Sequence, residues 1–80
     1  MNVREAVAAR ILVLCDERSI AINALAGSAG VSPSTVYSIL NTKSQNPGVV
    51  SLQKLCDGLG IALQEFINND LFDNIEQEIK

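Results

Sequence analysis

The 80-residue chain contains 48% hydrophobic residues, two cysteines and no histidine, and its net charge is −3 at pH 7. This length corresponds to one small domain, and the apolar content is sufficient for a packed core. Without histidine there is no Ser-His or Cys-His nucleophile pair, and two cysteines alone do not make the usual tetrahedral zinc site. We therefore expect no enzyme, no metal and no cofactor. The longest apolar run near the N-terminus, residues 11–15, is too short and too closely preceded by charges for a signal peptide or membrane span, so we expect a soluble cytoplasmic protein.

The two cysteines are candidates for one disulfide. However, Cys15 and Cys56 each lie within an apolar helical pattern, beside Leu14 and Leu55. This setting favours two buried thiols that belong to the core.

The charged residues are distributed unevenly along the chain. Residues 1–48 carry four basic and three acidic groups, for a net charge of +1, and residues 49–80 carry two basic and six acidic groups, for a net charge of −4. No Asp or Glu occurs between Arg18 and Cys56. This pattern indicates that the middle of the chain faces a polyanion.

The first predicted helix runs from about residue 3 to residues 17–19. Asn2, with Glu5 three residues later, resembles a capping box at its start. Its apolar residues recur at the spacing of one helix face, as in an amphipathic helix. The residues of this face are Val3, Val7, Ala8, Ile11, Leu14 and Cys15.

Two short helices follow, over about 22–29 and 33–41. Gly30 is predicted to end the earlier one, because glycine accepts the positive φ at which many helices stop. Ser32 is the expected N-cap of the next helix and Pro33 its first helical residue. The two helices are therefore expected to meet across one tight turn.

The polar stretch 41–48 contains Asn-Pro-Gly and is predicted to be a loop. The helical period returns over 49–59, and Gly60 is the expected stop. A short fifth helix is then predicted from three apolar residues, which are Leu63, Phe66 and Ile67. Without any strand alternation, the pattern predicts an all-α fold of five helices over residues 1–69.

Residues 70–80 are predicted to form a further amphipathic, acidic helical segment. Its apolar stripe consists of Leu71, Phe72, Ile75 and Ile79. A helix of this length is marginal alone, so the stripe needs a surface to cover it. Because a five-helix domain can close its core without this segment, we expect the stripe to contact a protein partner, and favour a second copy of the chain.

The pattern within residues 22–41 is that of a helix-turn-helix. A small residue is needed where two helices cross, a glycine at the turn, and apolar residues to fix the crossing angle. Six positions are in register with this requirement: Leu25, Ala26, Gly30, Val31, Val36 and Ile39.

With this motif, the loop Asn41-Thr42-Lys43 and the stretch 52–66 resemble the lambda-repressor-like, Cro and xenobiotic-response-element family of helix-turn-helix DNA-binding domains. The resemblance covers residues 3–69. It implies a lambda-repressor-like five-helix domain and a transcription regulator, such as a repressor, that binds operator DNA as a dimer. Ala21 and Ala62 depart from the family, which commonly has Ser or Thr caps there, so we expect weakened helix starts. Thr42 replaces the family's usual glycine.

The third predicted helix has a polar side opposite its apolar side. In this motif the N-terminal residues of the second helix reach base edges in the major groove, so Ser34, Tyr37 and Ser38 are the predicted base-reading residues. Pro33 and Asn41 lie on or beside the same polar side.

Other residues of this region are predicted to contact phosphates. Ser32 and Thr35 lie at the start of the helix, where free backbone amides attract anions. Lys43 follows the helix at the place where the family contacts the DNA backbone.

Two alternatives remain at the level of the sequence. The serine-rich side can be merely a solvated surface, and the Tyr37 ring can pack over the preceding helix instead of reaching DNA. The fold can also serve as a protein-interaction module, antitoxin-like or as a regulator subunit, with weak or no DNA binding.

Overall fold

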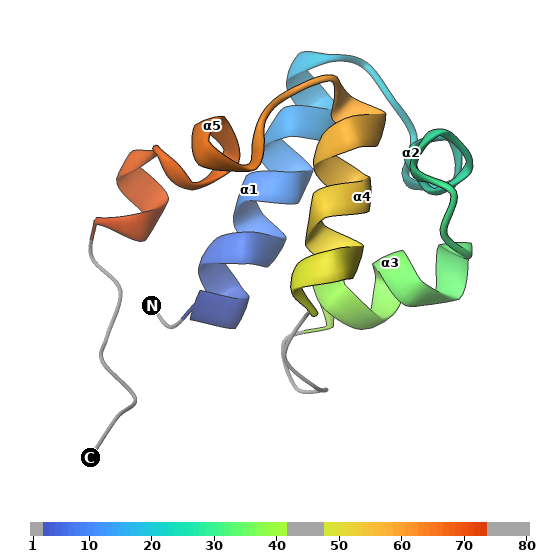
Figure 1. Cartoon of the computed structure of the whole chain (residues 1–80), viewed down its shortest axis with the longest axis horizontal. Coiled ribbons are helices and arrows are strands. Elements are labelled where there is room, and N and C mark those ends of the chain that lie inside the picture. The colour runs from blue at the N-terminus through green and yellow to red at the C-terminus, as the bar shows by residue number, and fades with distance from the viewer. Residues whose placement is uncertain (1–2, 42–47, 74–80) are drawn as a thin grey trace.

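The computed structural model describes residues 3–41 and 48–73 as an arrangement of helices (Figure 1). Its elements are α1 (Val3–Glu17), α2 (Ile22–Ala29), α3 (Pro33–Leu40), α4 (Val49–Leu59), α5 (Leu63–Ile67) and a short 3-10 helix, η1 (Asp70–Phe72). No strand occurs in these two ranges. The predicted all-α class and the order of the five helices are confirmed. None of the helices described is long and apolar enough to cross a membrane.

One hydrophobic core joins all five helices. Its fully buried side chains include Ile11, Leu25, Val36, Leu55 and Phe66, one from each helix. The predicted apolar face of α1 is confirmed from Val7 onward, whereas Val3, at the first residue of the helix, is 45% exposed.

Both cysteines are buried, free thiols, as expected. Burial raises the pKa of the Cys15 thiol, and Arg18 only partly opposes this effect. Burial and the Asp57 carboxylate raise the pKa of the Cys56 thiol, against a smaller opposite effect of Arg10. The neutral thiols therefore behave as small apolar side chains within the core.

The ends of the helices follow the predicted local rules. Gly30 and Gly60 take φ values of 72° and 75°, in the left-handed region that glycine adopts at low cost. Ala21 and Ala62 supply no side-chain cap to α2 and α5, as expected. At α5 the backbone amide of Ala62 instead donates to Glu65 Oε1 at 3.4 Å, which is half of a capping box.

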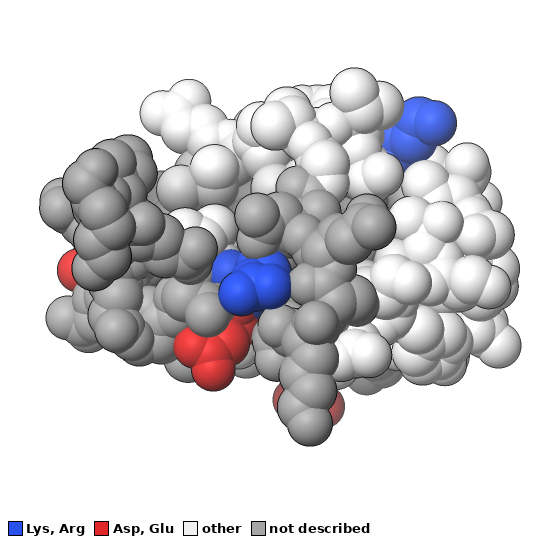
Figure 2. Space-filling view, turned by 90° about the horizontal axis from the view of Figure 1, so that it is seen from below, with Lys and Arg blue, Asp and Glu red and all other residues white. Residues whose placement is uncertain are grey.

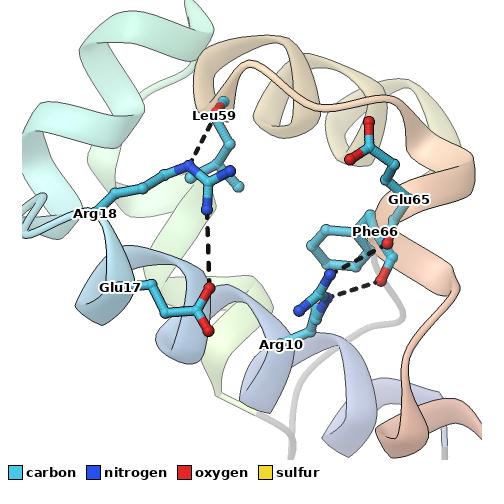
Figure 3. A network of polar contacts seen from close by, with 6 residues as sticks. All are labelled: Arg10, Glu17, Arg18, Leu59, Glu65 and Phe66. Atoms are coloured by element: carbon cyan, nitrogen blue, oxygen red, sulfur yellow. Dashed lines mark hydrogen bonds and ion pairs between the residues drawn. The ribbon is translucent and has the colours of Figure 1, made fainter.

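Arg10 of α1 and Arg18, which directly follows α1, bind the ends of other helices (Figure 3). Arg18 Nε donates to the carbonyl oxygen of Leu59, the last residue of α4, at 3.2 Å. Arg10 donates to the carbonyl oxygens of Phe66 and Glu65 in α5, at 2.9 and 3.1 Å. The last carbonyls of a helix lack partners within it and carry partial negative charge, so each guanidinium stabilises the helix end that it contacts.

The start of the C-terminal segment differs from expectation. Phe72 packs against the core, and its ring centroid lies 6.0 Å from that of Phe66. The five helices therefore do not close the core alone, because Phe72 covers the Phe66 side of it. Leu71 is partly buried, while Ile75 and Ile79 lie outside the described residues.

Candidate nucleic-acid interface

The helices α2 and α3 form the predicted helix-turn-helix. Leu25, Ala26 and Val36 are fully buried between the helices and the rest of the core, and Ile39 is 6% exposed. Val31 is partly buried against the same cluster. These contacts confirm the register that the sequence predicted, and they fix α3 relative to the domain.

The turn is held by backbone hydrogen bonds. The amide of Val31 donates to the carbonyl of Ala26 at 3.1 Å, and the amide of Gly30 donates to the carbonyl of Gly27 at 3.3 Å. The left-handed conformation of Gly30 permits both bonds. The turn ends directly before Ser32, which is the N-cap of α3.

The outer side of α3 is polar and open to solvent. Ser34, Tyr37, Ser38 and Asn41 are exposed and follow one another at helical spacing, which places them on one side of the helix. Tyr37 is 53% exposed. Pro33 is exposed at the start of the same helix. The structure thus brings five predicted DNA-contacting residues onto one accessible surface.

The first turn of α3 has its own hydrogen bonds. The amide of Thr35 donates to Ser32 Oγ at 3.3 Å, and the two hydroxyl oxygens lie 2.9 Å apart in a hydrogen bond. Only one of the two hydroxyl hydrogens is needed for that bond, so the pair retains one donor for a ligand. Lys43, the remaining predicted contact, lies outside the described residues.

The helix-turn-helix carries no charged side chain. Neither α2 nor α3 contains Lys, Arg, Asp or Glu. Figure 2 shows the lower face of the molecule, and on its right side, where α2 and α3 lie, the surface is white apart from one basic group at the edge. A polyanion at this surface would meet hydroxyl groups and backbone amides instead of cations.

A family model for the Cro/C1-type HTH DNA-binding domain matches residues 10–69. The chain belongs to this family. The matched range begins within α1 and ends just after α5, so it contains the complete helix-turn-helix. The resemblance stated from the sequence is therefore confirmed, and the molecule contains a DNA-binding domain of the regulator class.

A solved structure, that of the prophage Lp1 protein 11, is similar to this Cro/C1-type domain. The two chains share 26% sequence identity with a TM-score of 0.82, over 94% of this chain and 100% of the other. The search of curated proteins gives no match.

The sequence did not identify the residues outside the helix-turn-helix that hold the helices of this Cro/C1-type domain together. A Cβ atom at Gly58 of α4 would lie 3.0–3.1 Å from the backbone N, Cα and Cβ of Ala29, so α2 and α4 approach closely there. A glycine within a helical pattern permits such an approach but does not predict it, because Gly27 within α2 has nothing within 4 Å. Nor did any signal in the sequence mark Arg10 and Arg18 as helix-end ligands.

Proposed function

We propose that this chain is a sequence-specific transcription regulator that binds operator DNA as a homodimer in the cytoplasm. The observation that carries the proposal is the outer side of α3, where polar side chains stay exposed while the buried side of the helix fixes it in place. The favoured mode of regulation is repression, because repression requires only that the DNA be occupied. The proposal assigns no catalytic role to the chain.

In the proposed complex α3 enters the major groove. Ser34, Tyr37 and Ser38 contact base edges. The serines donate to or accept from several bases, and the Tyr37 ring offers an apolar surface to a thymine methyl group. Pro33 and Asn41 border this contact.

Phosphates are held at the two ends of α3. Ser32 and Thr35, together with the free amides of the first turn, bind one phosphate through neutral donors. Lys43 binds another after the helix. A protein with so few cations gains little from counterion release, so one protomer binds weakly and two are needed for a stable complex.

A selection from random-sequence DNA tests the proposal. The parent protein should enrich a two-fold symmetric sequence whose half-sites are centred about one helical turn apart. Ser38→Ala should change which sequences are enriched. Ser28→Ala is the matched control, because Ser28 is exposed on α2 and has no assigned contact. The absence of any enrichment or gel shift at low salt would contradict the proposal and favour a protein-interaction module.

A further inference from the structure

The last turn of α4 is held from two sides. On one side is Arg18, whose backbone amide donates to the carbonyl of Leu14 at 3.1 Å and so fixes the residue to the end of α1. Its Nε donates to the carbonyl oxygen of Leu59 at 3.2 Å in a partly buried setting (Figure 3). Charge-assisted hydrogen bonds are stronger than neutral ones, and the last carbonyls of a helix lack partners within it. Arg18 therefore ties the end of α4 to the end of α1.

On the other side, the same turn of α4 meets α2. A Cβ atom at Gly58 would lie 3.0–3.1 Å from three atoms of Ala29, whereas ordinary contact begins at 3.4 Å. Only glycine permits this approach of the two backbones without a shift. Because Gly58 and Leu59 are consecutive, a movement of the Leu59 carbonyl away from Arg18 also moves the surface that Ala29 contacts.

Ala29 lies directly before the turn that leads to α3. It is the last residue of α2, and Ser32, the N-cap of α3, follows three residues later. The amides of Gly30 and Val31 both donate to carbonyls of α2, which leaves little freedom within the turn. A shift of Ala29 is therefore passed to the first turn of α3.

The later part of α3 has a different anchor. Val36 and Ile39 are buried in the core and hold this part of the helix independently of Ala29. Ser34 precedes this anchor and Ser38 follows Val36, so a shift of the first turn changes the position of Ser34 relative to Ser38. Binding sites must hold their side chains within about 0.5 Å of the productive geometry. The placement of the first turn thus affects which bases α3 accepts.

Arg10 has the same chemistry without a path to α3. It donates to the carbonyl oxygens of Phe66 and Glu65 at 2.9 and 3.1 Å. Figure 1 shows α5 on the opposite side of the molecule from α2 and α3. Loss of either arginine removes hydrogen bonds to a helix end, but only the Arg18 bond ends on the turn that Ala29 contacts.

We propose that Arg18 is a positioning residue for DNA recognition. It holds the last turn of α4 against Ala29 and thereby sets the place of the first turn of α3. The inference rests on the proposed DNA binding. In this role the guanidinium acts within the protein, where its Nε binds Leu59 and its Nη1 lies 4.0 Å from the Glu17 carboxylate.

Arg18→Met tests this role, because it removes the hydrogen bond and keeps a long apolar side chain. The probes are a duplex enriched from random sequence with the parent protein and duplexes that differ from it by one base pair. Binding is measured where circular dichroism shows each protein folded. Arg18→Met should lower the discrimination between these duplexes by about five-fold or more, as for one weakened base contact. The slope of log K against log salt should stay unchanged, because no phosphate contact is lost.

Arg10→Met is the matched control. It should lower stability more than Arg18→Met does, yet leave the discrimination between duplexes unchanged. Gly58→Ala is the second variant, since its methyl group displaces Ala29 from the side of α4. It should also lower discrimination, and it carries the test where Arg18→Met does not fold.

Unchanged discrimination in the folded Arg18→Met protein, or in Gly58→Ala where Arg18→Met does not fold, would overturn the inference. A salt slope reduced by about 1 in Arg18→Met would also overturn it, because Arg18 would then contact a phosphate. An equal loss of discrimination in Arg10→Met would reduce the effect to general stability. A parent that enriches no sequence would instead refute the proposed function itself.

Discussion

Arg10 contacts Phe66 in two ways. Its Nε donates to the Phe66 carbonyl oxygen at 2.9 Å, and its guanidinium carbon lies 6.0 Å from the centroid of the Phe66 ring. One side chain of α1 thus holds both the backbone end and the aromatic ring of α5. Because Phe66 is fully buried and touches Phe72, this contact links the N-terminal helix to the C-terminal part of the described chain.

Arg10→Met should lower the free energy of unfolding by about 1–3 kcal/mol, since it removes charge-assisted hydrogen bonds and a cation–π contact but keeps a long apolar side chain. Urea unfolding followed by circular dichroism measures the change. Arg18→Met should cost less, because Arg18 makes one such carbonyl bond and its side chain is 34% exposed. Equal stability of Arg10→Met and the parent would show that the contact contributes nothing net.

Gly58→Ala and Gly27→Ala should change stability in opposite directions, although both add a methyl group to a helix. At Gly58 the methyl group meets the backbone of Ala29, so the helices must separate at a cost of about 1–3 kcal/mol. At Gly27 nothing lies within 4 Å, and the gain in helix propensity should stabilise the fold by about 0.5–1 kcal/mol. Thermal unfolding of the two variants checks both signs, and a stabilised Gly58→Ala protein would refute the close approach of α2 and α4.

Ser19→Gly should stabilise the protein. Ser19 has a φ of 53°, the only positive φ at a non-glycine residue in the described chain. A side chain in this region costs about 1 kcal/mol, and glycine removes this cost. Glycine also raises the conformational entropy of the unfolded chain, so only part of the gain appears as stability. The expected gain is about 0.5 kcal/mol in denaturant unfolding. Ser28→Gly, within α2, is the control and should be destabilising.

Lys43 and the serines of α3 should affect DNA binding differently. Lys43→Ala should weaken binding to all sequences alike and reduce the slope of log K against log salt by about 1 per protomer. Ser34→Ala and Ser38→Ala should instead change the ranking of operator variants by about 1 kcal/mol or more per lost contact. Binding titrations at several salt concentrations separate the two effects. An unchanged ranking in both serine variants would show that this side of α3 does not face the bases.

Stability should fall in alkaline solution as the thiols of the unfolded chain ionise. Burial raises the pKa of Cys15 and Cys56 above the ordinary value of 9.0, so the folded state holds their protons more strongly than the unfolded state does. The resulting stabilisation is complete below the unfolded pKa and is lost as the pH rises from there through the folded pKa. Urea unfolding at a series of pH values measures the trend, with Cys15→Ala as the comparison. A decline of equal size in that variant would show that Cys15 does not contribute to it.

The sequence by itself determined the local features of this protein. Ser32 and Pro33 start α3, Gly30 and Gly60 end the helices before them, and the six-residue register predicted the helix-turn-helix. Each of these features depends on residues within a few positions along the chain, through a backbone amide, a φ value or the period of a helix face. Local rules therefore suffice to predict them.

Only the tertiary structure decided how the helices are joined and which apolar residues remain outside. Arg10 contacts a carbonyl 56 residues away, and Gly58 is required by the backbone of Ala29 in another helix. The sequence predicted Val3 and Phe72 as members of apolar faces, yet the former is exposed and the latter joins the core. Helical periodicity shows that a face is apolar, but whether it is covered depends on the distant segments that the fold places beside it.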